Sequence, residues 1–213
     1  MDVIYTKLSD EIFEDVLEGI NNNFVAYEAM SKYLKFDEKA IKENKELLRS
    51  YMKIAYDDSI IVKDSKSNKV IGAIINADFT LTFNMPKVEI TSEKLKPIAA
   101  ILAEQEENLL KHANDKIVEK QYLYTIATYV DRKFNGQNIG TNLYKKTEEN
   151  AFKSGFQNLV TISTGPVSQH IRKKHMFVPI KLIEYKAFEF ENEHPFKNME
   201  EVSTINLWAK KLY

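Results

Sequence analysis

The chain has 213 residues, of which 30 are Lys or Arg, 31 are Asp or Glu, and 44% are hydrophobic. This balance excludes a strongly basic surface for nucleic acid or anionic membranes, and the apolar content excludes an intrinsically disordered chain. The lack of cysteine excludes disulfides, thiolate zinc sites and a thiol nucleophile.

The first third of the chain predicts one strand followed by helices. Residues 2–8 alternate as a strand does, and Ser9 then stands where an N-cap would begin a helix with one apolar face. The polar stretch NNNF at residues 21–24 is expected to end this helix. A second helix is expected from about Tyr27 to Tyr56.

The middle of the chain predicts a hairpin, a helix and a buried strand. Two β-branched runs divided by a polar turn form the hairpin over residues 59–79, and a polar bend follows over residues 83–94. Residues 95–113 form an amphipathic helix that tolerates Pro97 in its first turn. Residues 122–130, YLYTIATYV, are apolar and β-branched almost throughout, as in a strand buried on both faces.

The last third predicts a strand, loop, helix, strand unit and a final hairpin. A helix over residues 139–153 leads to a fifth strand over residues 158–164. A short helix follows over residues 166–175. Two more strands, over residues 181–190 and 202–212, complete the chain.

Size and composition predict a single domain over residues 1–213 that buries its own core. The start lacks an apolar core of signal-peptide length, and no apolar run approaches the roughly 20 residues of a membrane span. We therefore expect a cytoplasmic monomer or homodimer that binds a small molecule, with no nucleic-acid or membrane partner. The four histidines lack metal-ligand spacing, so no metal is implied.

The loop FNGQNIGTNL at residues 134–143 holds two of the six glycines, Gly136 and Gly140, directly before the helix that follows. Glycines allow backbone amides to approach a phosphate, and a helix N-terminus attracts anions. This arrangement indicates a pyrophosphate site, although a plain strand-to-helix turn would have the same pattern. The loop lacks the Gly-Lys-Ser/Thr of an NTPase, and no acid follows about 20 residues later to bind a ribose.

The segment from Tyr129 to Thr141 resembles the coenzyme-A loop of the GNAT acetyltransferases. It keeps that loop's Val, aromatic, Gly, Gln, Ile and Gly positions and departs from it at Asn135 and Asn138. The order of elements matches the family along nearly the whole chain. The resemblance therefore implies an α/β (α+β) GNAT fold: a central mixed sheet of about seven strands, flanked by helices, with a splay between strands four and five.

In the GNAT family the pantetheine arm of acetyl-CoA lies in that splay and the loop amides take the pyrophosphate. By resemblance, Arg132, Lys133 and Lys145 would reach the adenosine-side phosphates, although each is equally well read as part of a solvated basic face. The residues implied to bind the cosubstrate acetyl-CoA are Thr128, Tyr129, Val130, Asn135, Gly136, Gln137, Asn138, Ile139, Gly140 and Thr141.

The segment NNFVAYEAMSKYL at residues 22–34 resembles part of the insect dopamine and arylalkylamine N-acetyltransferases, and Glu28 falls on their catalytic glutamate. The role is chemically sensible, because an apolar setting raises the pKa of a carboxylate toward that of a useful base. The alternative is an ordinary solvated acid at a helix start.

The segment at residues 161–177 resembles the insect-type motif Thr-Gly-x-x-Ser-Gln. Ser168 would then protonate the departing sulfur, directly or through water, although Ser168 could equally cap the helix. Where many members of the superfamily carry an acidic tyrosine, this chain has Arg172. Tyr129 and Tyr185 are other candidates, so the acid stays open.

Together these features predict an acetyl-CoA-dependent N-acetyltransferase with Glu28 as base and Ser168 as second catalytic residue. The substrate would be a primary amine, an arylalkylamine or polyamine, attacking directly in a ternary complex. Two alternatives stay open: acetylation of a protein N-terminus or lysine, and a degenerate CoA-binding regulator without turnover.

Overall fold

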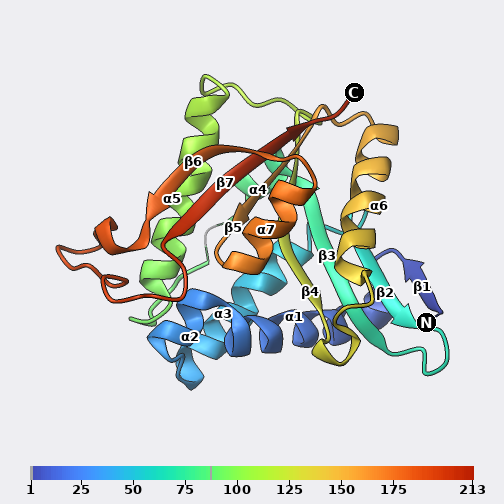
Figure 1. The fold of residues 1–213 in the computed structure, drawn as a ribbon, viewed down its shortest axis with the longest axis horizontal. Coiled ribbons are helices and arrows are strands. Elements are labelled where there is room, and N and C mark those ends of the chain that lie inside the picture. Colours follow the sequence, from blue (N-terminus) through green and yellow to red (C-terminus); the bar gives the residue numbers. More distant parts are fainter. Residues whose placement is uncertain (1, 87) are drawn as a thin grey trace.

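In a computed structural model, which describes residues 2–86 and 88–213, the chain forms one mixed sheet flanked by helices (Figure 1). Within these residues the sheet has seven strands in the order β1-β2-β3-β4-β5-β7-β6. β4 and β5 are parallel, and the other neighbours pair antiparallel. The predicted fold class is confirmed.

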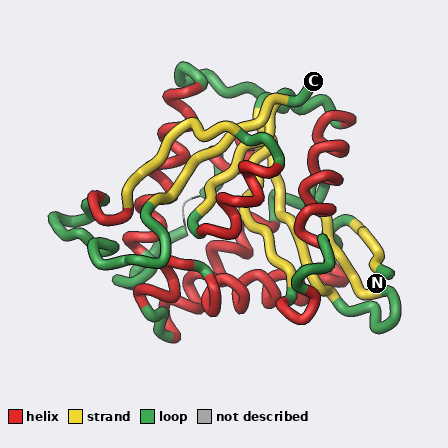
Figure 2. Tube along the Cα trace, viewed as in Figure 1, coloured by secondary structure: helices red, strands yellow, loops and turns green. Residues whose placement is uncertain are grey.

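The strands form a twisted sheet with helices on both sides (Figure 2). Their bounds are β1 Val3–Thr6, β2 Ile60–Asp64, β3 Val70–Asp78, β4 Tyr122–Val130, β5 Asn158–Ser163, β6 Val178–Glu184 and β7 Thr204–Lys211. The α-helices are α1 Phe13–Tyr27, α2 Ala29–Leu34, α3 Glu38–Met52, α4 Phe79–Phe83, α5 Lys96–His112, α6 Ile139–Lys153 and α7 Pro166–Lys174.

The first helix differs from the expectation at both ends. α1 continues through the NNNF stretch, because Asn21 is buried and its Oδ1 accepts a hydrogen bond of 2.8 Å from Asn44 of α3. The expected N-cap is also wrong: Ser9 precedes a short 3-10 turn and, within the described residues, its side chain makes no capping bond. Tertiary contact thus overrides the local preference of asparagine for turns.

The expected second helix is two helices. Glu28 is extended and separates α1 from α2, and Lys35 adopts a left-handed conformation with φ of 52° that ends α2. Asp37 then caps α3 by accepting a hydrogen bond from the amide of Ala40 at 2.9 Å. The chain therefore turns sharply on either side of α2, which places Glu28 at a corner.

Several strand boundaries also differ, and two of them have a clear structural reason. The sixth strand ends at Glu184, before the predicted end at residue 190, because Tyr185 starts a 3-10 turn and its side chain is fully buried. The first hairpin ends at Asp78, whose carboxylate caps the unpredicted helix α4 through the amide of Thr80. Pro97 lies in the first turn of α5, as predicted.

Helices α1 and α6 cover opposite faces of the sheet. Successive residues of a strand point to opposite faces, and Tyr129 packs against Gly19 of α1 while Thr128 contacts Tyr144 of α6. Gly19 is required there, because a Cβ would lie 2.3 Å from the Tyr129 hydroxyl. In the described part of the chain, no helix is long and apolar enough to cross a bilayer.

Candidate functional site

The parallel strands β4 and β5 separate before they end. Their pairing stops at Thr125 and Thr161, whereas β4 continues along β3 as far as Val130 and β5 continues along β7 as far as Ser163. A register irregularity leaves Ile126 of β4 without a partner on β3, and a bulge of this kind bends a strand. The predicted splay is therefore present, and β4 beyond Thr125 has an edge that β5 does not cover.

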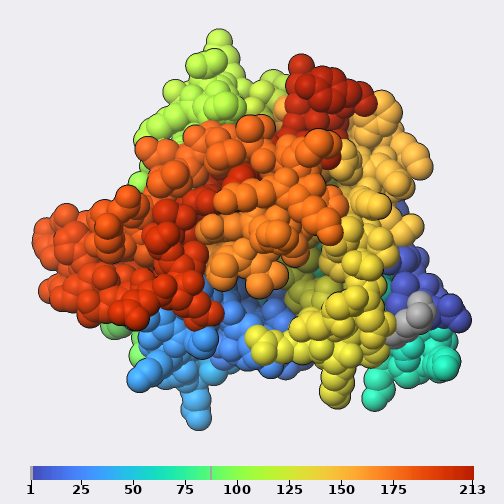
Figure 3. Space-filling view, in the orientation of Figure 1, coloured from blue at the N-terminus to red at the C-terminus, as the bar shows by residue number. Residues whose placement is uncertain are grey.

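The space between the parted strands opens toward the glycine loop. In Figure 1, β4 runs down to the loop below α6, whereas β5 ends beside α7. Figure 3 shows a recess bounded by the yellow loop segment, the orange helix α7 and the blue N-terminal helices. Thr128 and Val130, with Tyr129 between them, form the end of β4 that leads into this loop.

The loop has the backbone of an amide cradle. Gly136 has φ of 77° and Asn138 has φ of 60°, so both lie in the left-handed region that glycine and asparagine adopt best. Asn135 and Gln137 flank Gly136 in this turn. Helix α6 begins at Ile139, and among the described residues no side chain caps its first-turn amides.

A hollow of about 690 Å³ lies at this helix start, between α6 and α7. Its lining includes Gln137, Asn138 and Thr141 and three lysines, of which Lys210 pairs with Glu148 at 2.6 Å. A diphosphate needs hydrogen-bond donors and positive charge. The uncapped amides and the lysines supply both, so the residues fit the phosphates of coenzyme A. Lys145 also lines the hollow, and its contact with a phosphate stays a prediction.

The two glycines of the loop offer a matched test. A methyl group at Gly140 would lie no closer than 4.0 Å to Val130, whereas Gly136 needs a positive φ that costs a non-glycine residue about 1–2 kcal/mol. We expect Gly136→Ala to weaken CoA binding by about 5–30-fold and Gly140→Ala to leave it within about twofold, by calorimetry. Equal losses in both variants would contradict this account of the loop.

Glu28 occupies the corner between α1 and α2. Its Oε2 accepts a hydrogen bond of 2.7 Å from the amide of Ser31, which caps α2. Its Oε1 is buried and has no hydrogen-bond partner among the described residues. Burial raises the pKa of Glu28 above its ordinary value, although the bonds from Ser31 oppose that shift. The carboxylate thus has a free, basic oxygen.

The end of β5 and the turn after β6 meet at Glu28. Tyr185 donates a hydrogen bond of 2.9 Å from its hydroxyl to the carbonyl of Thr164, and the nearby Thr164 hydroxyl lowers the pKa of the Glu28 carboxyl, against the larger effect of burial. Burial, together with the charge of Glu28, raises the pKa of Tyr185 beyond its usual range. Three segments far apart in sequence therefore converge on one carboxylate.

Ser168 lies at the start of α7. Its hydroxyl donates a hydrogen bond of 2.9 Å to the carbonyl of Gly165, and it also lies 3.4 Å from the Gly165 amide. This is the capping arrangement that the sequence left open as an alternative. A catalytic role for Ser168 stays a prediction, as does that of Glu28.

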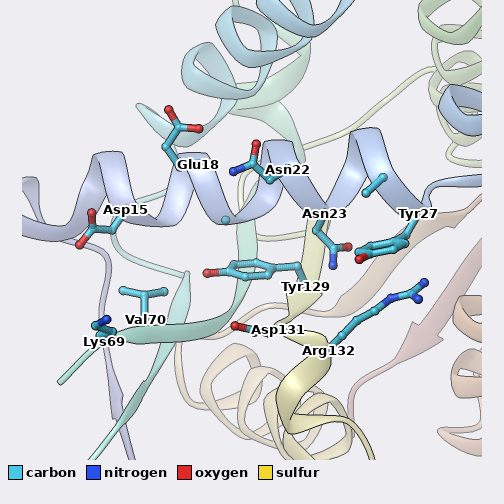
Figure 4. Close-up of a pocket in the computed structure, with 12 residues that line it drawn as sticks. Asp15, Glu18, Asn22, Asn23, Tyr27, Lys69, Val70, Tyr129, Asp131 and Arg132 are labelled. Carbon is cyan, nitrogen blue, oxygen red and sulfur yellow. The ribbon is translucent and has the colours of Figure 1, made fainter. Parts of the chain in front are cut away.

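A second hollow, of about 670 Å³, was not anticipated from the sequence. It lies between α1 and the ends of β3 and β4, and Figure 4 shows Tyr129 between Asp15 and Asp131, with Arg132 beside Tyr27. The guanidinium of Arg132 lies 3.3 Å from the centroid of the Tyr27 ring, so in this structure it packs on α1. The sequence did not mark Asp15 and Glu18 of α1 as lining a hollow, because acidic residues on the polar face of a helix are ordinarily solvated.

Known structures share the fold. The C-terminal condensation domain of Ebony, in complex with beta-alanyl-dopamine, aligns with a TM-score of 0.82 and 19% identity over 99% of both chains. Arylalkylamine N-acetyltransferase 2 from Aedes aegypti aligns with a TM-score of 0.76 and 22% identity over 100% of both chains. The polyamine N-acetyltransferase of Drosophila melanogaster aligns with a TM-score of 0.74 and 13% identity over 99% of this chain and 100% of its own.

The sequence itself matches a family model. Residues 27–173, well over half of the chain, match the model described as the acetyltransferase (GNAT) family. This region includes the Glu28 corner, the parted strands, the glycine loop and nearly all of α7. The prediction of an acyltransferase class is confirmed at this level: the chain belongs to the GNAT family of acetyltransferases.

Proposed function

We propose that the protein transfers an acetyl group from acetyl-CoA to a small primary amine, an arylalkylamine or a polyamine, in a ternary complex. One observation carries the proposal: β4 and β5 part between an amide cradle at α6 and Glu28, which lies beside Thr164 at the end of β5 and has a buried oxygen without a hydrogen-bond partner among the described residues. Acetyl-CoA supplies the activated acetyl group.

Different residues bind the diphosphate, pair with the pantetheine arm and accept the proton of the amine. Amides of the loop from Gly136 to Thr141 hold the diphosphate, and the free edge of β4 at Thr128 to Val130 pairs with the pantetheine amides. Glu28 takes the proton of the attacking amine, which arrives mostly protonated near neutral pH. Because the pKa of Glu28 is raised, its carboxylate is a stronger base than a solvated glutamate.

The choice of amine is supported by the solved structures that share the fold. They include arylalkylamine, polyamine and agmatine N-acetyltransferases, whose names specify small amines. Phe24, Tyr33 and Phe36 pack against the core cluster that contains Ala29 and Met30, the two residues after Glu28 in the chain. Aromatic side chains near a carboxylate suit an amine that carries an aryl or alkyl group.

The test measures binding and turnover separately. Calorimetry with CoA should give binding, and release of free thiol from acetyl-CoA should accelerate with phenethylamine-type amines, diamines or agmatine. An absence of CoA binding at millimolar concentration would overturn the proposal. Binding without thiol release from any amine of the panel would instead support the alternative of a regulatory CoA binder, which the departures Asn135 and Asn138 motivate.

A further inference from the structure

Arg172 of α7 is a buried cation without an anion. Its side chain is 97% buried, and in the described part of the chain no carboxylate lies within ion-pair distance of it. Its Nη2 donates a hydrogen bond to the hydroxyl of Tyr144 and lies 3.4 Å from Oγ1 of Thr161. Its Nε and Nη1 are buried with no partner among the described residues.

This arrangement is energetically costly. Burial lowers the pKa of Arg172, but a guanidinium keeps its proton in proteins, so the charge stays. Removing such a charge from water costs several kcal/mol. The guanidinium lies 3.8 Å from the centroid of the Tyr144 ring and 5.5 Å from that of Phe177, and cation–π contacts return only about 0.5–2 kcal/mol each. The nitrogens Nε and Nη1 still lack hydrogen-bond acceptors among the described residues, and the positive charge lacks a counter-ion there.

The guanidinium lies at the fork of the parted strands. Thr161 is the last residue of β5 that pairs with β4, and its hydroxyl donates a hydrogen bond of 3.2 Å to the carbonyl of Thr125. On the other side, Tyr144 shares a hydrogen bond of 2.8 Å with the hydroxyl of Thr128 on β4. Arg172 and Tyr144 therefore bridge the two strands where they separate.

Among the described residues, the ionisable groups near Arg172 do not supply an anion. Tyr144 of α6 is a phenol, and burial lowers the pKa of His175 on α7, with Lys210 and Arg172 adding to that effect. The carboxylate of Glu148 is paired with Lys210 of β7 at 2.6 Å. Within the described residues Arg172 therefore lacks an anion, and a bound ligand would supply one.

We propose that Arg172 binds the sulfur of coenzyme A as a thiolate. The inference rests on the proposed function, in which the amine nitrogen bonds to the acetyl carbon and the carbon–sulfur bond breaks, leaving its electron pair on sulfur. Glu28 takes the ammonium proton before attack, the second proton leaves the nitrogen to water as the amide forms, and the thiolate takes a proton from water after release. Arg172 thus stabilises the leaving group by charge, in place of a proton donor.

The test is the ionisation of the bound thiol. Ultraviolet absorbance of the thiolate is titrated in the CoA complex and corrected with the complex of desulfo-CoA, which has no thiol. A free thiol of this kind has a pKa of about 8.5, and we expect binding to lower that pKa by about one to two units. In Arg172→Gln the bound thiol should return to its ordinary pKa or rise above it. Arg172→Lys should keep part of the shift.

The matched control is Lys173→Gln, which removes a charge from the same helix at an exposed position and should leave the thiol pKa unchanged. Should Arg172→Gln not fold, the wild-type titration and Arg172→Lys still decide. A wild-type complex that titrates like free CoA overturns this inference, even with full turnover of amines. The inference is also overturned if the thiol bound to Arg172→Gln has the same lowered pKa as the thiol bound to the wild type. An absence of CoA binding overturns both this inference and the proposed function.

Discussion

Glu28→Gln is expected to lower kcat by about 10²–10⁴-fold while CoA binding stays within twofold of wild type, because a glutamine cannot accept the proton of the amine. The substitution keeps an oxygen that accepts the hydrogen bond from the Ser31 amide, so the cap of α2 survives. Stopped-flow release of thiol, beside calorimetry with CoA, measures the two effects separately.

The pH dependence gives a second readout. Because the pKa of Glu28 is raised, the wild-type kcat/KM should rise with pH through that pKa, and this limb should vanish in the glutamine variant. The matched control is Glu38→Gln, an exposed glutamate at the start of α3, for which we expect wild-type kinetics. Glu28→Gln with the wild-type rate and pH profile would remove Glu28 as the base.

The second large effect concerns stability, at Glu106 of α5. Burial raises the pKa of this carboxyl to about 7, although Tyr124 of β4 and Tyr51 of α3 lower it somewhat by hydrogen bonding. The folded state therefore holds this proton more tightly than the unfolded state. Stability is greatest below the unfolded pKa and falls as the pH rises toward about 7. The loss is on the order of 3 kcal/mol.

Glu106→Gln should remove that loss. At pH 8 we expect the free energy of unfolding to increase, by at most about 3 kcal/mol, and near pH 4.5 to change little. Urea unfolding at both pH values measures the difference. Glu107→Gln, the exposed neighbour on the same helix, is the control and should not alter the pH dependence. The same pH slope in Glu106→Gln and wild type would refute the assignment.

The departures from the expected N-terminal helices have different causes. Asparagines favour turns in isolation, but Asn21 gains a buried partner in Asn44 of α3, and the helix continues. The separation of α2 from α3 was foreseeable, since Asp37 is followed by a helix-forming run and makes a good N-cap. The backbone of Lys35 was not, because a left-handed lysine is set by its neighbours.

The sequence by itself determined the order of the strands, the parallel unit around the glycine loop and the family, since hydrophobic periodicity and glycine placement are local properties of the chain. Only the tertiary structure decided which side chains share a site. Glu28 meets Thr164 and Tyr185, and Arg172 meets Thr161, because the sheet brings together segments separated by long stretches of chain. Burial shifts the pKa values of these groups and leaves the charge of Arg172 without a counter-ion among the described residues. It arises from that packing and leaves no local pattern in the sequence.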